Sequence, residues 1–277
     1  MHRIGIVAAG EERPWRRKKW YEFWKQQKDY DFISHESIHV ESAIVYLPNE
    51  GISINEVPRE RIGAWLAKAG EFFEEQEIRD VVCTRSVREA LGSDIDIWGV
   101  KVHNGLRLLR MLAPNILRQV AKVKGVAGGS LAYVDDRITG ENDQMIEEMC
   151  RQCRYITIIS DDREGRARLA AKLYDEFGVA ADVRSPLDGY VDCDFAVAVG
   201  GKMPKISNHA IVVDVSGRKV ECENETQVDW VSVNSKELRL PYDVDSLELA
   251  EMLTEFGEMQ EFKITKLYHR GKRVKFH

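Results

Sequence analysis

Residues 130–163 read SLAYVDDRITGENDQMIEEMCRQCRYITIISDDR. The apolar runs at 130–136 and 155–160 predict two strands, and residues 141–154 between them predict a helix. Near-continuous apolar strands of this kind are expected in a parallel sheet that is covered on both faces. This stretch therefore predicts an α/β fold with a mainly parallel sheet.

The same alternation continues towards the C-terminus. Residues 163–178 predict a helix that stops at Gly178, because glycine commonly terminates helices in a left-handed conformation. Further strands are expected at 180–184, 194–201 and 209–217. A last helix is expected to end near Phe256, with Asp243 or Asp245 as its N-terminal cap.

Upstream, residues 104–123 predict a long helix, bent or interrupted at Pro114. The first hundred residues predict strands at 4–8, 43–47 and 78–83. Pro58 is expected to start a helix that runs to about Glu75, whose apolar residues follow a 3.6-residue period. A strand, a helix and a strand at this spacing indicate a second parallel α/β unit.

Composition sets outer limits on the class of protein. The chain has 277 residues, 44% of them hydrophobic and 31% charged, which indicates one large or two ordinary globular domains. A net charge of -6 and a pI near 5.8 make nucleic acid and membrane surfaces unexpected partners. Five cysteines, without a secretory leader or a long apolar run, predict a cytoplasmic location and no membrane span.

Basic residues concentrate in two segments, 13–28 and 263–277, each with a net charge of +6. The first segment also carries aromatic residues, so one interpretation is a local patch for an anion or polynucleotide. The alternative, which we favour, is an ordinary surface helix with Trp20 and Trp24 packed inward and the basic side chains in water. Neither segment identifies a partner.

The order of these elements resembles the Rossmann dinucleotide-binding domain. More narrowly, it resembles two-domain proteins of the shikimate dehydrogenase and glutamyl-tRNA reductase type. The resemblance implies an N-terminal α/β domain at 1–103, a connecting helix at 104–125, a Rossmann-like domain at 126–235, and a returning C-terminal helix with a basic tail at 236–277. It also implies NAD or NADP as the cofactor, and a small-molecule or nucleotide ligand.

The resemblance places the cofactor at three strand ends. Asp161 and Asp162 stand where an acidic residue holds the adenosine ribose, and Gly200 and Gly201 would allow close approach of the nicotinamide side. The phosphate loop departs from the family pattern, because the chain contains no G-x-G and Asp135 and Asp136 would face the pyrophosphate. The implied cofactor-binding residues are Asp136, Arg137, Gly140, Asp161, Gly200 and Gly201.

The repeated DDR after two consecutive strands, at 135–137 and 161–163, has two interpretations. Four carboxylates at one sheet edge suit Mg²⁺ or Ca²⁺, and aspartates directly before helices suit N-terminal caps. We favour the caps. Cys150 and Cys153 form a C-x-x-C near a helix C-terminus, where the dipole disfavours a thiolate, so we expect buried structural cysteines.

Three functions therefore remain open from the sequence. The first is an NAD(P)-dependent oxidoreductase or nucleotide binder, and the second is a non-catalytic binding or regulatory protein on a degenerate dehydrogenase scaffold. The third is a zinc-dependent hydrolase, since His35, Glu36 and His39 form H-E-x-x-H. The β-branched residues around this motif favour an extended chain, which would point Glu36 away from both histidines, so we assign no metal ligands.

Overall fold

The computed structural model describes residues 2–9, 30–35, 40–48, 53–91, 95–126, 128–217, 220, 222, 224, 226–234, 244–257 and 263–274. Two compact units make up the chain. Unit 1 comprises residues 1–105 and 234–263, and unit 2 comprises residues 106–233 and 264–277. The basic segment 13–28 and residues 36–39 of the H-E-x-x-H motif lie outside the described residues.

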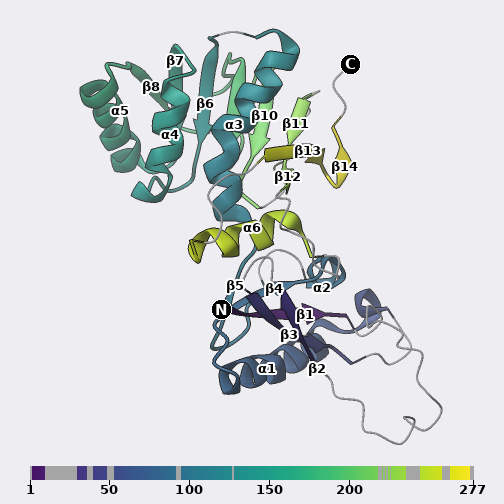
Figure 1. Cartoon of the computed structure of the whole chain (residues 1–277). Coiled ribbons are helices and arrows are strands. Elements are labelled where there is room, and N and C mark those ends of the chain that lie inside the picture. The colour runs from purple at the N-terminus through teal and green to yellow at the C-terminus, as the bar shows by residue number, and fades with distance from the viewer. Residues whose placement is uncertain are drawn as a thin grey trace, which may run out of the picture. The chain divides into compact units, whose positions relative to one another are not determined.

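Unit 1 contains a five-stranded sheet in the order β2-β3-β1-β4-β5 (Figure 1). β3, β1, β4 and β5 are parallel to one another, and β2 runs antiparallel to β3 at one edge. The mixed α/β class that the sequence indicates is therefore present in this unit. The five strands are β1 (His2–Ala8), β2 (Tyr30–His35), β3 (Val40–Tyr46), β4 (Asp80–Cys83) and β5 (Lys101–Val102).

A short 3-10 helix, η4 (Ile54–Glu56), precedes helix α1 (Arg59–Glu75), which connects β3 to β4. α1 begins directly after Pro58, as expected from a proline whose fixed φ suits the first turn of a helix. Its buried face repeats at helical spacing, so burial of this apolar stripe against the sheet stabilises the helix. That face consists of Ile62, Leu66, Ala69, Gly70 and Phe73.

Two further helices complete unit 1. α2 (Arg85–Leu91) follows β4 directly, and α6 (Ser246–Glu255) returns from the far end of the chain and packs on β4. Asp245 caps α6 by accepting a hydrogen bond from the amide of Leu247. It is one of the two residues that the sequence predicts for this role. Asp243, the other, lies outside the described residues. α6 is buried nearly all round, and this burial includes Glu248 and Glu251.

Unit 2 is built on a fully parallel six-stranded sheet in the order β11-β10-β9-β6-β7-β8. If β6 is counted as the first strand, this is the order 3-2-1-4-5-6 of dinucleotide-binding domains. The unit therefore has a Rossmann-like topology. Its strands are β6 (Ser130–Val134), β7 (Tyr155–Ile159), β8 (Ala181–Arg184), β9 (Phe195–Ala198), β10 (Ile211–Asp214) and β11 (Thr226–Val228).

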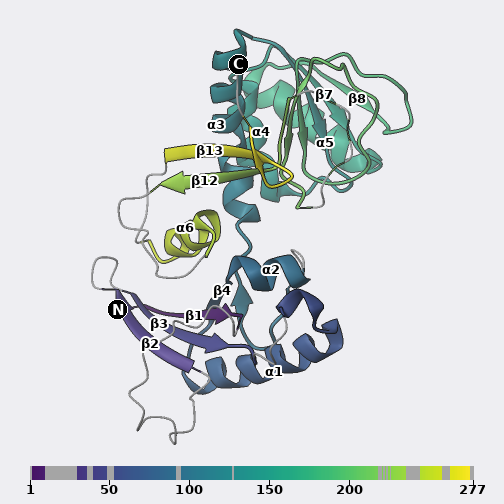
Figure 2. The same cartoon turned by 90° about the vertical axis from the view of Figure 1, so that its right-hand side faces the viewer.

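Three α-helices pack on this sheet: α3 (Leu106–Lys124), α4 (Asp143–Cys150) and α5 (Arg163–Phe177) (Figure 2). α3 contacts α4 and β10, and α5 contacts β7 and β8. The expected interruption at Pro114 is wrong, because α3 continues through this residue. Proline removes one backbone hydrogen bond, but buried apolar residues such as Leu109 and Leu117 hold the turns on both sides.

One apolar cluster in unit 2 contains no helix residues. Ala132, Val134 and Val212 from the strands pack with Val191 and Ile206. The connections 185–194 and 199–210 contain no helix, so irregular chain covers these strand residues where a complete doubly wound fold has helices. This departure lies in the second half of the unit, after β8.

A separate three-stranded sheet has the order β12-β13-β14. It consists of β12 (Trp230–Asn234), β13 (Lys263–His269) and β14 (Lys272–Arg273). Much of the predicted basic tail therefore forms a hairpin, since β13 and β14 are antiparallel. None of the helices among the described residues has the length and apolarity needed to cross a bilayer.

Candidate functional site

The carboxyl ends of β6, β7 and β9 meet at one edge of the six-stranded sheet, because the three strands are parallel neighbours. The order of connection reverses between β6 and β9, which makes this the topological switch point of the unit. In open α/β sheets, ligands bind at such a point outside the carboxyl ends of the strands. The sequence-predicted DDR and Gly-Gly motifs all follow these three strands.

Asp135, directly after β6, is a buried side chain and part of the protein interior. Its carboxylate accepts a hydrogen bond of 2.8 Å from the hydroxyl of Tyr133 and one of 3.3 Å from the amide of Arg137. Burial raises the pKa of Asp135, and these two hydrogen bonds oppose the shift. Asp135 therefore shapes the loop and is not the helix cap that we favoured from the sequence.

Gly200 and Gly201, after β9, lie against the loop that follows β6. A methyl group at Gly200 would come within 2.7 Å of the Asp136 carboxylate, and one at Gly201 within 3.1 Å of the Asp136 backbone nitrogen. Gly201 also has a φ of 77°, which favours glycine. The structure thus brings Asp136 and the Gly-Gly turn together, and glycine is needed there for the approach of this chain's own loop.

After β7, the two aspartates have different roles. Asp162 is the N-terminal cap of α5 and accepts a hydrogen bond of 2.9 Å from the amide of Gly165. That hydrogen bond lowers the pKa of Asp162. Asp161 is exposed at the same edge. Asp162 confirms the cap interpretation of the second DDR, and Asp161 remains available to a ligand.

The remaining predicted residues, Arg137 and Gly140, are exposed in the segment that joins β6 to α4. Gly140 begins the short 3-10 helix η5 (Gly140–Asn142), and α4 follows it. Asp143 in the first turn of α4 forms an ion pair with Lys172. This segment contains no glycine pair of the kind that lets a pyrophosphate approach a helix N-terminus.

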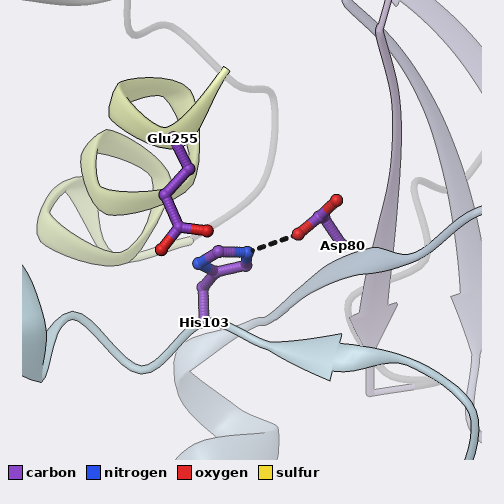
Figure 3. A group of neighbouring side chains, drawn as sticks. All are labelled: Asp80, His103 and Glu255. Atoms are coloured by element: carbon purple, nitrogen blue, oxygen red, sulfur yellow. Dashed lines mark hydrogen bonds and ion pairs between the residues drawn. The ribbon is translucent and has the colours of Figure 1, made fainter. Parts of the chain in front are cut away.

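Unit 1 contains a second polar group, which the sequence did not predict. His103, after β5, is 1% exposed, and its Nε2 lies 2.9 Å from Oδ1 of Asp80 on β4. Its Nδ1 lies 3.5 Å from a carboxylate oxygen of Glu251 on α6, with no hydrogen bond of acceptable geometry. Figure 3 shows the imidazole between Asp80 and Glu255, and Glu255 also pairs with Lys101.

The pKa of His103 depends on its burial and on the carboxylates that face it. Burial alone would lower the pKa of His103, but the facing carboxylates of Glu251 and Asp80 outweigh it and raise that pKa. Nearby on α6, Glu248 is 1% exposed and pairs with Arg88 of α2, which also contacts Asp245. Burial raises the pKa of Glu248 to about 8, against the opposing effect of Arg88.

Within the described part of the chain, Asp80, His103 and Glu255 are the one group of three whose ligand atoms all lie within 4.8 Å of one another. The DDR carboxylates do not form such a group there, so the structure gives no support to the Mg²⁺ or Ca²⁺ interpretation. His103 and α6 are about 150 residues apart, and no local motif connects them. The available signal in the sequence is the pair Glu248 and Glu251 among the apolar residues 247–253 at the centre of this helix.

The cysteines are structural, as expected. All five are free thiols, and Cys150, Cys153 and Cys193 are buried. Burial raises the pKa of Cys150 to about 11 and those of Cys153 and Cys193 to about 12. Such thiols are protonated at neutral pH, which favours a structural role over a redox-active C-x-x-C.

No known family model and no curated protein matches the chain. Among solved structures, it resembles the ligand-free form of 5-ketofructose reductase of Gluconobacter sp. strain CHM43, with 12% identity, a TM-score of 0.31, and coverage of 77% of this chain and 78% of that one. It also resembles L-tryptophan dehydrogenase from Nostoc punctiforme, with 9% identity, a TM-score of 0.34, and coverage of 92% and 68%. At this similarity neither structure assigns a function to this chain.

The topology itself defines the class. The chain is an α/β protein whose unit 2 is Rossmann-like and mainly parallel, and whose C-terminal helix α6 returns to the N-terminal α/β unit.

Proposed function

We propose that unit 2 binds a dinucleotide, NAD(H) in preference to NADP(H), at the carboxyl edge of β6, β7 and β9. The observation that carries the proposal is the strand order, because its switch point lies between β6 and β9. Asp161 follows the second strand of this order and is exposed. An acidic residue at that position in dinucleotide-binding domains accepts hydrogen bonds from the adenosine ribose.

The same position explains the preference for NAD(H). Asp161 and Asp162 would face the additional phosphate on the ribose of NADP(H) with like charge. The two aspartates therefore disfavour NADP(H) and leave a ribose hydroxyl as the better partner.

The phosphate region supports only weak binding. Arg137 and the N-terminal end of α4, after Gly140, offer positive charge to a pyrophosphate. Asp136 opposes it, and its contact with Gly200 and Gly201 occupies the turn that a nicotinamide would approach. We therefore expect affinities weaker than those of a domain with a complete glycine loop.

The more specific proposal is an oxidoreductase of the two-domain dehydrogenase type, acting on a small molecule with NAD as hydride carrier. The second candidate is a non-catalytic binding or regulatory protein on the same scaffold. Burial of Asp135 and the packing of Asp136 on Gly201 favour this candidate, since both stabilise the loop without a ligand. The free thiols support a cytoplasmic location for either.

The test is thermal unfolding of the full chain with millimolar NAD⁺, NADH, NADP⁺ or NADPH. A ligand at about 100 times its Kd stabilises the folded state by about 2.7 kcal/mol, which raises the Tm by several degrees or less for a chain of this size. We expect a shift with NAD⁺ and NADH that Asp161→Ala abolishes. Asp175→Ala is the matched control, because Asp175 is an exposed acid on α5.

No shift with any of the four cofactors overturns the proposal, and so does a shift that Asp161→Ala leaves unchanged. Turnover then distinguishes the two candidates. Formation of NADH from NAD⁺ with a panel of hydroxy acids, polyols and amino acids supports the oxidoreductase. NADH binding without turnover of any panel member favours the non-catalytic protein.

A further inference from the structure

We propose that unit 1 holds a divalent transition-metal ion between Nδ1 of His103 and the carboxylates of Glu251 and Glu255, with Asp80 orienting the imidazole ring. The site is independent of the proposed nucleotide site. Its residues come from the end of β5, from α6 and from β4, all within unit 1 (Figure 3).

The first observation is a buried nitrogen without a hydrogen bond. His103 is 1% exposed, and its Nδ1 has no hydrogen-bond partner in the described structure. Buried polar atoms are nearly always satisfied, so an exception in a native interior needs an explanation such as a bound water or ion, even though Nδ1 lies in ion-pair range of Glu251 at 3.5 Å. Nδ1 faces α6, where Glu251 and Glu255 lie.

The second observation is the arrangement of the carboxylates. Glu251 and Glu255 are four residues apart on α6, a spacing that places both on one helical face. An oxygen of Glu251 lies 3.5 Å from Nδ1. Metal–ligand bonds of ~2.1 Å at tetrahedral angles separate neighbouring ligand atoms by ~3.4 Å, so this pair already has the required spacing.

Glu255 is the third proposed ligand, and its carboxylate must move towards Glu251, because His103, Glu251 and Glu255 are not among the described groups whose ligand atoms all lie within 4.8 Å of one another. An oxygen of the Glu255 carboxylate lies within 4.8 Å of an imidazole nitrogen of His103. Glu255 stands at the exposed end of α6, which gives an ion access from water. A long glutamate side chain can close the remaining distance by rotation about its single bonds.

Asp80 provides the support that metal-bound histidines usually have. The Nε2 of His103 lies 2.9 Å from Oδ1 of Asp80, and donation from Nε2 to this carboxylate would leave the lone pair of a neutral ring on Nδ1. A carboxylate on the opposite ring nitrogen both orients a ligating histidine and increases its basicity. The geometry thus matches a carboxylate–histidine–metal relay.

Lys101 already pairs with one of the proposed metal ligands. Its ammonium group pairs with the carboxylate of Glu255. A divalent ion and this ammonium group would therefore compete for the same carboxylate. Removal of the Lys101 charge is expected to tighten metal binding, an effect that a chance surface site would not show.

The donor set selects the class of ion. One imidazole nitrogen and two carboxylates suit Zn²⁺, Mn²⁺ or Fe²⁺, and three protein ligands leave a position for water. Mg²⁺ and Ca²⁺ prefer oxygen ligands alone and are expected to bind more weakly. Zn²⁺ is therefore the probe of choice.

The test is calorimetric titration of the chelator-treated full chain with Zn²⁺. We expect one Zn²⁺ per chain at this site, lost in Glu251→Gln and in Glu255→Gln. Asp80→Asn is expected to weaken binding ~10–100-fold, as loss of an orienting carboxylate does. Lys101→Met is expected to tighten binding by up to ~5-fold, the strength of an exposed ion pair.

Glu248→Gln is the matched control, because Glu248 lies on the same helix but pairs with Arg88. It is expected to bind Zn²⁺ like the original chain. Circular dichroism establishes that each variant is folded, and Glu255→Gln, at the exposed end of α6, keeps the test decisive if Asp80→Asn unfolds. Absence of Zn²⁺ binding overturns the proposal. The proposal is also overturned if Zn²⁺ binding survives in Glu255→Gln, which would indicate another site such as His35 and His39. It is likewise overturned if Lys101→Met weakens Zn²⁺ binding.

Discussion

Gly201 lies against Asp136 so closely that a methyl group on Gly201 would be 3.1 Å from the Asp136 backbone nitrogen. The two residues follow β9 and β6, the strands between which the order of connection reverses. The Gly-Gly turn therefore has a structural role in the protein without ligand. Any dinucleotide at this edge must either fit beside Asp136 or displace its side chain.

Gly201→Ala is expected to destabilise unit 2 more than Gly178→Ala. Both glycines have positive φ, at 77° and 65°, and a left-handed alanine costs roughly 1–2 kcal/mol. A methyl group at Gly178 meets nothing within 4 Å, whereas one at Gly201 also meets the Asp136 backbone. Calorimetric unfolding measures the difference. Equal losses of stability in the two variants would show that the contact with Asp136 is unimportant.

Of the two aspartates after β7, we expect Asp162 to contribute to stability and Asp161 to contribute to ligand binding. Asp162→Ala removes the cap of α5 and should cost ~1 kcal/mol, within the usual range for N-terminal caps. Asp161→Ala should change the free energy of unfolding by less than ~0.5 kcal/mol, because Asp161 is exposed. Urea unfolding of both variants checks this, and a larger loss in Asp161→Ala would contradict the assignment of roles.

Tyr133→Phe is expected to destabilise unit 2 by ~1–3 kcal/mol, since it leaves Oδ2 of the buried Asp135 without its donor and only the longer hydrogen bond from the amide of Arg137 remains. The loss should be larger at pH 7 than at pH 4, because a protonated Asp135 needs that donor less. Tyr155→Phe, at an exposed tyrosine of β7, is the control. A loss that does not depend on pH would indicate a packing effect alone.

Glu248→Gln is expected to flatten the pH dependence of stability. The ordinary pKa of 4.5 applies to Glu248 in the unfolded chain, and burial raises its pKa in the folded chain to about 8. The folded protein therefore holds an extra proton between these values, and stability from this group falls as pH rises through this window, by at most about 1.4 kcal/mol per pH unit.

Glutamine cannot titrate, so the metal-free variant should lose less stability than the original chain between pH 5 and pH 8. Urea unfolding at a series of pH values measures both curves. Parallel curves would show that Arg88 keeps Glu248 ionised throughout this range.

The sequence predicted most elements of unit 2 because their signals are local. Gly178 does end α5 in the left-handed conformation, and the apolar runs of β6 and β7 do form neighbouring parallel strands. Pro58 likewise precedes α1. Each of these signals depends on residues within one turn or one strand, which a single sequence displays directly.

Contacts across long separations could not be predicted in this way. The roles of Asp135 and Gly201 depend on the register of β6 against β9, which the strand sequences do not reveal. His103 meets Glu251 only because α6 returns to unit 1. A histidine after a short strand and an acid in an apolar helix gave no common pattern, so the group in unit 1 was missed.

The most direct test of the account is a fluorescence titration of the full chain with NADH and with NADPH, repeated for Asp161→Ala. We predict saturable binding of NADH, weaker binding of NADPH, and loss of NADH binding in the variant. Absence of NADH binding, or NADPH binding at least as tight as that of NADH, would contradict the proposed dinucleotide site.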